Sequence, residues 1–347
     1  MPLKKTLSIS QSTAAYLQEL SGNRSAGTVR AYRIGLAHFL ILLTDLGLDP
    51  ARAQPAALNE AHALQFLTYL QDLRLSSASQ RLYTTALKGF LEYLTWQKLA
   101  GEINLAQIER FVQKRLPRPG QRLPQFPRQE IDTLLDYALS LGKNPSAEAR
   151  QHLIELRDRA LLVTLADTGL RIHEACRLRR GDLDWHEGKA ILIGKGDKQA
   201  VVRFSARSLA ALKNYLDARE PLDHRHGGQL SGLPVFTGHS PRNAGQNPPA
   251  ANARMRSTPL TPRAAQNIVR QRTLQALGPQ AVGRITPHSF RHYFVTNVLR
   301  ATGGNLRAAQ KLARHSQIGT TERYAHLADD ELDQVYHEVF NEEERRF

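Results

Sequence analysis

The stretch Thr286–His292 reads Thr-Pro-His-Ser-Phe-Arg-His and forms a dense cluster of polar residues. Pro287 suits the first turn of a helix, so His288 and Arg291, three residues apart, are expected on one helix face. A guanidinium group can hold two oxygens of an anion, and an imidazole can move a proton near neutral pH. The pair therefore suits a phosphate or another oxyanion, although an ordinary surface helix can carry the same two residues.

A second cluster lies upstream, where Ala166–Glu174 reads Ala-Asp-Thr-Gly-Leu-Arg-Ile-His-Glu. A glycine followed by an arginine at the boundary of an element presents the guanidinium from a fixed backbone. Glu174 follows Arg171 by three residues and is placed to orient it. A surface ion pair would give the same pattern.

Between these clusters, two β-rich runs at 188–193 and 200–204 flank Gly194–Lys198. This arrangement predicts a β-hairpin. Lys195 would lie at its tip, where a lysine on a turn can reach a ligand phosphate. Lys198 competes for that role, and a solvated turn lysine is the alternative.

Near the end of the chain, His315 is followed nine residues later by Tyr324. Taken alone, a tyrosine at this place is compatible with ordinary core packing. Residues 329–347 hold eight acidic residues and two arginines, with apolar residues at helical spacing. They predict an amphipathic helix that docks on its own body or on a neighbouring subunit.

The chain has 347 residues and a net charge of +15, and without the acidic tail the remainder carries +21. Such an excess indicates a polyanionic partner, and nucleic acid is favoured over a membrane surface. No stretch approaches the ~20 apolar residues of a membrane-spanning helix. The single cysteine, Cys176, excludes an internal disulfide framework and a zinc site built from cysteines. We expect a cytoplasmic protein that associates with the nucleoid of a bacterial-type cell.

Three regions differ in character. Residues 1–112 predict a small all-α domain, with helices near 25–46 (capped by Ser25), 58–74 and 77–97. Residues 113–127 hold four prolines and four basic residues and predict an extended linker. Residues 128–347 predict mainly helices around the small β-hairpin, with a proline- and glycine-rich stretch at 222–260 that includes a short strand at Leu233–Thr237. The fold class is therefore mainly α with a small β element (α+β). The basic residues expected to contact DNA are Arg30, Arg33, Arg81, Lys88 and Arg122.

Taken in order, the clusters resemble those of the tyrosine recombinase (phage integrase) family, and in particular its Xer-like site-specific recombinases. The resemblance covers essentially the whole chain. It implies a SAM-like helical core-binding domain followed by a catalytic domain, which close on duplex DNA as a C-shaped clamp.

The resemblance also implies the chemistry. Tyr324 would attack the phosphate to give a 3′-phosphotyrosine, without a metal or another cofactor and without ATP. Arg171 and Arg291 would hold the non-bridging oxygens, and Lys195 would protonate the departing 5′-oxygen. His288 would assist proton transfer and His315 would donate to a phosphate oxygen, while Glu174 would support the site and His292 would be structural.

The partners implied are double-stranded DNA at a specific inverted-repeat site and three further copies, which make a homotetramer on two duplexes. A partner recombinase or an accessory protein is compatible with the pattern. The alternatives are a catalytically silent DNA-binding accessory protein, a type IB topoisomerase-like DNA relaxase and a basic RNA-binding helical protein. The complete set of six catalytic positions argues against a silent protein.

One position departs from the family pattern. Many Xer-type members have Leu-Gly-His where this chain has Ala313-Arg314-His315. The arginine adds charge beside the expected active site and removes a flexible glycine, and at this position the chain is similar to integrases of mobile elements.

Overall fold

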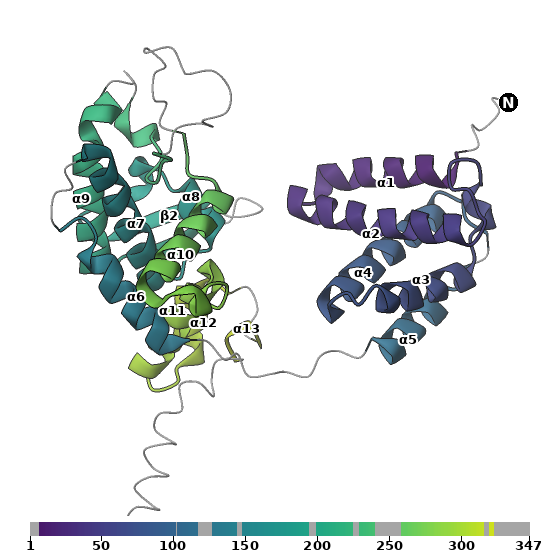
Figure 1. The fold of residues 1–347 in the computed structure, drawn as a ribbon. Helices are drawn as coiled ribbons and strands as arrows, with labels where there is room; N and C mark the ends of the chain where they lie inside the picture. Colours follow the sequence, from purple (N-terminus) through teal and green to yellow (C-terminus); the bar gives the residue numbers. More distant parts are fainter. Residues whose placement is uncertain are drawn as a thin grey trace, which may run out of the picture. The chain divides into compact units, whose positions relative to one another are not determined.

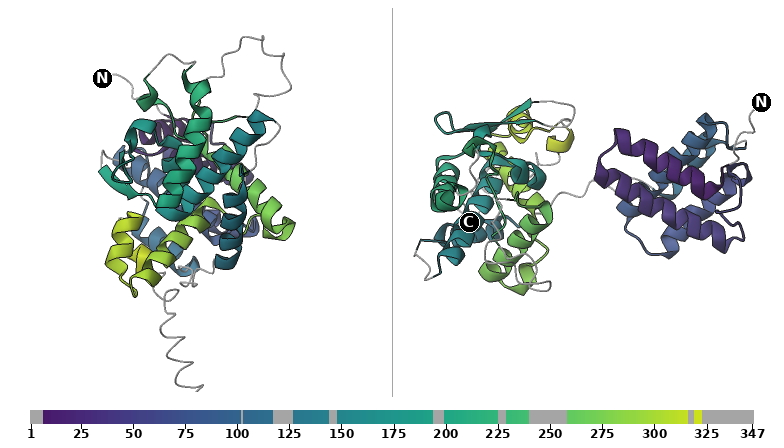
Figure 2. Two further views of the ribbon diagram at one scale, coloured as in Figure 1. Left: turned by 90° about the vertical axis from the view of Figure 1, so that its left-hand side faces the viewer. Right: turned by 90° about the horizontal axis from the view of Figure 1, so that it is seen from above.

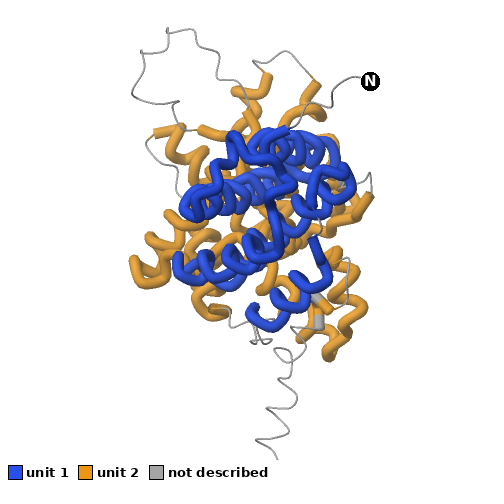
Figure 3. Tube along the Cα trace, turned by 90° about the vertical axis from the view of Figure 1, so that its right-hand side faces the viewer, with its two compact units in different colours: residues 1–122 blue, residues 123–347 orange. Residues whose placement is uncertain are grey.

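The computed structural model describes residues 7–101, 103–116, 127–143, 148–193, 199–224, 229–239, 258–315 and 319–322 (Figure 1). The chain divides into two compact units, Met1–Arg122 and Leu123–Phe347 (Figure 3). Each unit has its own hydrophobic core.

The first unit is built from helices throughout its described part (Figure 2). They are α1 (Ile9–Asn23), α2 (Ala26–Asp45), the short 3-10 helix η1 (Pro55–Ala57), α3 (Glu60–Asp72), α4 (Ser77–Trp96) and α5 (Leu105–Arg115). The helices expected at 25–46, 58–74 and 77–97 are thus confirmed within two residues. Polar caps set their starts, because Ser25, Asn59 and Ser76 accept backbone N–H groups of the first turns.

Three phenylalanines from different helices form the centre of this unit: Phe39 of α2, Phe66 of α3 and Phe90 of α4 are each at most 1% exposed. Gly35 lets α2 approach α4 closely, since a Cβ there would lie 2.9 Å from the Tyr83 ring. The core of the unit therefore depends on both side-chain volume and close backbone approach.

By length and composition, α2 is the one helix in the described residues that could span a membrane. This differs from the sequence expectation that no segment qualifies. The helix nevertheless places Leu36, Phe39 and Leu43 in the core, and Arg30 and Arg33 are exposed on it. An amphipathic core helix accounts for these contacts.

The expected linker starts later than its sequence suggested. Gln113, Lys114 and Arg115 belong to α5, whereas an extended segment was predicted from residue 113. These three residues favour helices, and the first helix-breaking proline is Pro117. Residues 117–126, with Arg122, lie outside the described residues.

The second unit surrounds one helix, α7 (Ala149–Thr168). This helix contacts α6 (Arg128–Ser140), α8 (Ile172–Arg177), α9 (Ala206–Asp223) and α11 (Pro287–Ala301). Helix α10 (Pro262–Leu277) packs on α6 and α8, α12 (Leu306–Ala313) packs on α11, and α13 (Gly319–Glu322) packs on α12. Short 3-10 helices lie at η2 (Arg180–Asp182), η4 (Leu230–Gly232) and η5 (Pro279–Ala281).

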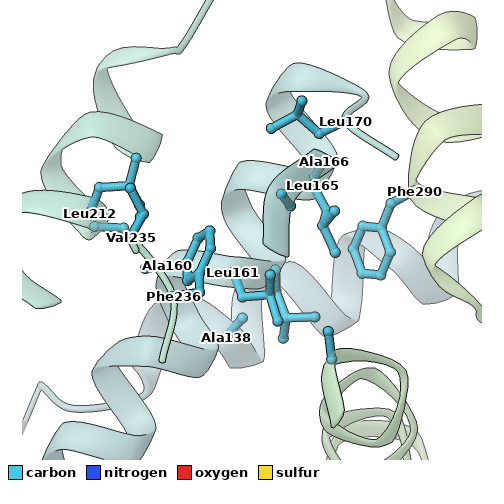
Figure 4. Packing of buried hydrophobic residues seen from close by; sticks show 14 of the residues in the cluster. Ala138, Ala160, Leu161, Leu165, Ala166, Leu170, Leu212, Val235, Phe236 and Phe290 are labelled. Carbon is cyan, nitrogen blue, oxygen red and sulfur yellow. The ribbon is translucent and has the colours of Figure 1, made fainter. Parts of the chain in front are cut away.

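From Leu156 to Ala166, α7 is buried on every side. Leu161 and Leu165 pack with Leu212 of α9, with Phe290 of α11 and with Phe236, which lies between η4 and α10 (Figure 4). Inside this core, the Asp158 carboxylate binds Arg157 and, from α10, Arg272, each at 2.7 Å. Charges removed from water need such partners, so the central helix is locked by an ion network as well as by apolar packing.

A three-stranded antiparallel sheet completes the unit, with β1 (Leu183–Asp184), β2 (Lys189–Ile193) and β3 (Gln199–Arg203) in that order. Ile193 pairs with Gln199, so the expected hairpin is confirmed and the structure adds β1. The strand predicted at Leu233–Thr237 is wrong. Only isolated bridges form there, between Arg179 and Pro234 and between Thr237 and Pro259.

Candidate active site

The turn after α7 delivers Arg171. Gly169 ends the helix in the left-handed conformation (φ 58°, ψ 24°). A Cβ at this position would lie 2.4 Å from the Phe294 ring, so both the backbone angle and the packing require glycine. The chain then turns into α8, with Arg171 as its N-cap.

Glu174 holds Arg171 in place. Its carboxylate accepts hydrogen bonds from the Arg171 backbone N–H and from the Arg171 Nη1, both at 2.9 Å. Burial by itself would raise the pKa of Glu174, but the Arg171 N–H and the charges of Arg314 and Arg171 outweigh it and leave the pKa below its usual value. Glu174 is therefore an anion that supports Arg171, as expected from their spacing.

Helix α11 contributes Arg291 and His288. Thr286 caps the helix through the Ser289 N–H and Pro287 occupies its first turn, as the sequence indicated. Arg291 is 3% exposed. Its Nη1 donates to the Gly169 carbonyl at 2.6 Å and its Nη2 donates to the Ala313 carbonyl. This guanidinium thus joins the turn before Arg171 to the turn before His315.

His288 is exposed and its ring meets that of His292 edge to face, with centroids 4.3 Å apart. Partial burial lowers the pKa of His288, and the charges of Arg291 and Arg171 lower it further. Burial, with the neighbouring His288 and Arg291, lowers the pKa of His292 to about 4. Both imidazoles are therefore held towards their neutral forms beside the arginines.

The end of α12 delivers His315. Arg314 has left-handed backbone angles (φ 57°, ψ 43°), its N–H donates to the Lys311 carbonyl and the His315 N–H donates to that of Gln310. These bonds make a Schellman motif, which usually has glycine at the left-handed position. An arginine there carries a strain of about 1–2 kcal/mol.

His315 is buried, and its Nδ1 lies 2.8 Å from the Thr321 hydroxyl oxygen of α13. Burial lowers its pKa to about 4, and Arg291, Arg171, Arg314 and His292 lower it too. A neutral imidazole at pH 7 can donate from only one nitrogen, and the Thr321 hydroxyl pairs with Nδ1 in either tautomer, as acceptor or as donor.

The Arg314 side chain enters the same region. Its Nη1 lies 3.4 Å from the Thr168 carbonyl, and its Nη2 lies 3.4 Å from the Gly169 carbonyl and from the Glu174 Oε2. Burial lowers the pKa of this guanidinium. Arg314 therefore touches the support of Arg171 as well as a carbonyl that Arg291 binds.

The structure brings four of the six expected catalytic residues together: Arg171, His288, Arg291 and His315. Lys195 and Tyr324 lie outside the described residues. Their flanking elements are described, however. Strand β2 ends at Ile193 and β3 begins at Gln199, on either side of Lys195 in the sequence. Helix α13 ends two residues before Tyr324 and is hydrogen-bonded to His315 through Thr321.

The residues expected to contact DNA differ in their surroundings. Arg30 and Arg33 are exposed on α2, and neither forms an ion pair with any residue of the described part of the chain. Arg81 donates to the Leu116 carbonyl, and Lys88 binds Glu109 at 2.7 Å and Glu92 at 3.7 Å. Of these four residues, Arg30 and Arg33 are therefore the ones whose charge remains available to a phosphate backbone.

Thr321 and the contacts of Arg314 were not found by sequence reasoning. A threonine six residues after a histidine gives no recognisable signal, and the left-handed angle of Arg314 becomes visible only in the backbone. In the described ranges, no three His, Cys, Asp or Glu side chains gather so as to hold a metal ion.

Comparison with known proteins identifies the fold and the family. Residues 127–331 match the model of the phage integrase family, and residues 13–98 match that of the phage integrase N-terminal SAM-like domain. Among solved structures, the XerH site-specific recombinase bound to a palindromic difH substrate has a TM-score of 0.66 at 20% identity, covering 95% of this chain and 84% of that one.

Two curated relatives extend the match over nearly the full length. Tyrosine recombinase XerC of Halalkalibacterium halodurans is 30% identical over 325 residues, 92% of each chain. Tyrosine recombinase XerD of Chlorobaculum tepidum is 29% identical over 341 residues, 98% of this chain and 97% of the relative. The chain belongs to the phage integrase family and is a tyrosine-type site-specific recombinase, an enzyme that cleaves and rejoins DNA.

Proposed function

We propose that Tyr324 attacks the scissile phosphate and forms a 3′-phosphotyrosine intermediate. The phenol gives its proton to the neutral imidazole of His288, the tyrosine oxygen bonds to phosphorus, and the bond from phosphorus to the 5′-oxygen breaks. Lys195 supplies the proton that the leaving 5′-oxygen takes up. The observation that carries the proposal is the double anchorage of Arg291, which joins the turns of Arg171 and His315 around one place.

Arg171 and Arg291 stabilise the charge that develops on the non-bridging oxygens. Preorganised cations in a partly dehydrated site do this with little reorganisation. His315 donates a hydrogen bond to a phosphate oxygen as a neutral imidazole, and His288 assists proton transfer. The arginines provide the positive charge that two-metal nucleases take from ions. The phosphotyrosine retains the energy of the broken bond, so rejoining needs no ATP.

The enzyme binds DNA, and we assign the sequence-independent part of binding to the exposed cations of α2 together with the linker that contains Arg122. The two units would close on the duplex as a clamp. The reaction would take place in a homotetramer on two duplexes with inverted-repeat sites, in the cytoplasm. Residues 329–347 are the proposed contact to a neighbouring subunit, and deleting them should spare binding to a half-site and weaken assembly on native gels.

The test uses a nicked suicide substrate that carries a candidate site from the DNA flanking the gene. Wild type and Tyr324→Phe are incubated with it in EDTA and separated on a denaturing gel. We expect a covalent protein–DNA band with the wild type alone. A band with both proteins would mean that another residue is the nucleophile, and tight binding without any band would favour a silent DNA-binding protein.

A type IB topoisomerase-like relaxase would form the same covalent band. Relaxation of a supercoiled plasmid that lacks the candidate site separates the two activities, since a site-specific recombinase leaves this plasmid supercoiled.

A further inference from the structure

The backbone conformation and the burial of Arg314 both cost free energy of folding, and the proposed reaction gives this residue no role. It adopts left-handed backbone angles, and its side chain is only 10% exposed. Its Nε is buried and has no hydrogen-bond acceptor in the described part of the chain. Glycine would avoid both the strain and the buried charge. The side chain must therefore provide something that glycine lacks.

The contacts of Arg314 connect the two turns that carry phosphate-binding groups. On one side its backbone forms the Schellman turn that leads directly into His315. On the other side its guanidinium reaches the Thr168 and Gly169 carbonyls, at the end of the turn that leads into Arg171. The carbonyl end of a helix favours a positive charge, so α7 attracts this guanidinium.

The charge balance around Glu174 gives Arg314 a second effect. Arg171 and Glu174 alone form an ion pair at 2.9 Å without net charge, which would weaken the attraction of Arg171 for a phosphate. Arg314 approaches the other carboxylate oxygen, Oε2, at 3.4 Å. The three side chains together carry one net positive charge. The carboxylate can then orient Arg171 without cancelling its field.

We propose that Arg314 is a positioning residue for DNA cleavage, which fixes Glu174 against Arg171 and keeps this cluster positively charged at the scissile phosphate. The inference rests on the proposed function, because it assigns Arg171 to the phosphate. Arg314 acts through Glu174 and the two turns, so its removal should slow the chemical step and leave DNA binding nearly unchanged.

The central experiment compares wild type with Arg314→Gly. This substitution keeps the left-handed turn, so the melting temperature should stay close to the wild-type value. In single-turnover reactions on the suicide substrate, covalent complex formation should slow by about tenfold to a hundredfold, the effect of misplacing a group by ~1 Å. Half-site affinity on native gels should change by less than about twofold, since no DNA contact is removed.

Two further readouts separate positioning from a general structural role. Millimolar guanidinium ion should restore part of the Arg314→Gly rate, because it fits the vacated place, whereas equal sodium should not. A methylphosphonate at the scissile position lacks one negative charge. On this substrate the cleavage rate of the variant should therefore lie much closer to the wild-type rate than it does on the phosphate. Arg314→Lys keeps the charge but loses the planar set of N–H donors of the guanidinium, and should cleave at an intermediate rate.

The matched control is Arg74→Gly in the first unit, where an exposed arginine also has left-handed angles (φ 50°). It should cleave at the wild-type rate. Cleavage by Arg314→Gly at the wild-type rate would overturn this proposal. The proposed function would still stand in that case, because the wild type forms the covalent protein–DNA band. Equal losses on phosphate and methylphosphonate, without guanidinium rescue, would also overturn it. Absence of a wild-type band would overturn the proposed function and this inference together.

Discussion

At the scale of single residues, one hydroxyl group holds a histidine of the site in place. His315 is neutral at pH 7 because burial and nearby arginines lower its pKa to about 4. When the Thr321 hydroxyl donates to Nδ1, the proton of the neutral ring must sit on Nε2. His315 then presents an N–H donor to the phosphate, which is the role that the proposed mechanism requires.

Thr321→Val tests this contact. The substitution keeps the shape of a fully buried side chain and removes the hydroxyl. Single-turnover cleavage should slow by about tenfold, because the ring loses the contact that supports a proton on Nε2. DNA binding should not change.

Thr164→Val is the control, since Thr164 is equally buried and its hydroxyl has no hydrogen-bond partner in the described residues. It should cleave normally. If the two valine variants had equal rates, the Thr321 hydroxyl would have no part in the reaction.

At the scale of elements, two helix ends with left-handed residues position the site. Gly169 ends α7 before Arg171, and Arg314 ends α12 before His315. Arg291 of α11 binds a carbonyl from each of these turns. The positions of the proposed phosphate-binding groups therefore depend on where α7 and α12 end and on the contacts of α11 with both ends.

Gly169→Ala tests the first of these ends. The new methyl group would strain the backbone and would meet the Phe294 ring at 2.4 Å, so the free energy of unfolding should fall by about 2–4 kcal/mol. Residual folded protein should cleave poorly because Arg171 moves. Urea titration followed by circular dichroism measures the first effect, and the suicide substrate measures the second.

Gly304→Ala provides the comparison, because Gly304 also has a positive φ (+79°) but has open space around it. It should lose only the backbone strain of about 1–2 kcal/mol. A Gly169→Ala variant as stable as Gly304→Ala would show that Phe294 moves aside.

Much of this architecture follows from the sequence. Ser25, Asn59 and apolar residues at helical spacing predict the helices of the first unit, and Gly194–Lys198 between two β-rich runs predicts the hairpin. Helix ends are less predictable, as the three residues that extend α5 to Arg115 demonstrate. The residue types alone, two arginines and a histidine at Arg171, Arg291 and His315, are typical of phosphate chemistry.

The remaining parts could not be predicted because they depend on contacts between distant segments. The Arg291 bond to Gly169 spans 122 residues, and the Arg314 pair with Glu174 spans 140. In sequence, Arg314 is a departure from a family pattern and nothing more. Its backbone angle and its contacts with the Thr168 and Gly169 carbonyls give it a place in the site.

At the scale of the whole molecule, the charge of +15 should make DNA binding sensitive to salt. Arg30→Ala and Arg33→Ala should each reduce the slope of log K against log salt by about 0.9, because each phosphate contact releases counterions. Fluorescence anisotropy over a range of salt concentrations measures the slope. Arg52→Ala, which removes an exposed cation outside the predicted contact residues, should leave it unchanged. Equal slopes for all three variants would mean that this face of α2 does not meet DNA.

Two buried histidines, His239 and His315, and the half-buried His292 make the second unit sensitive to acid. Burial and nearby arginines lower the pKa of His239 to about 3, and His292 and His315 have pKa values of about 4. Below pH ~6.5 these histidines become protonated in the unfolded chain but stay neutral in the folded protein. The free energy of unfolding therefore falls as the pH drops from 6.5 towards 4.

The melting temperature should therefore decrease by several degrees between pH 7 and pH 5. His239→Gln removes one of the three groups and should reduce this difference, even though the loss of the 2.8 Å bond to Tyr215 lowers stability at pH 7. A variant with the full wild-type decrease would exclude His239 as a source of the acid sensitivity.

The burial of α7 from Leu156 to Ala166 has a consequence for engineering new target sites. Changes between Leu156 and Ala166 disturb the core and the turn of Arg171 together, because the same helix provides both. A library intended to retarget the recombinase should keep this helix fixed and vary other exposed positions of α2, leaving the proposed phosphate contacts Arg30 and Arg33 in place to retain affinity. New specificities can then be selected without losing most clones to misfolding.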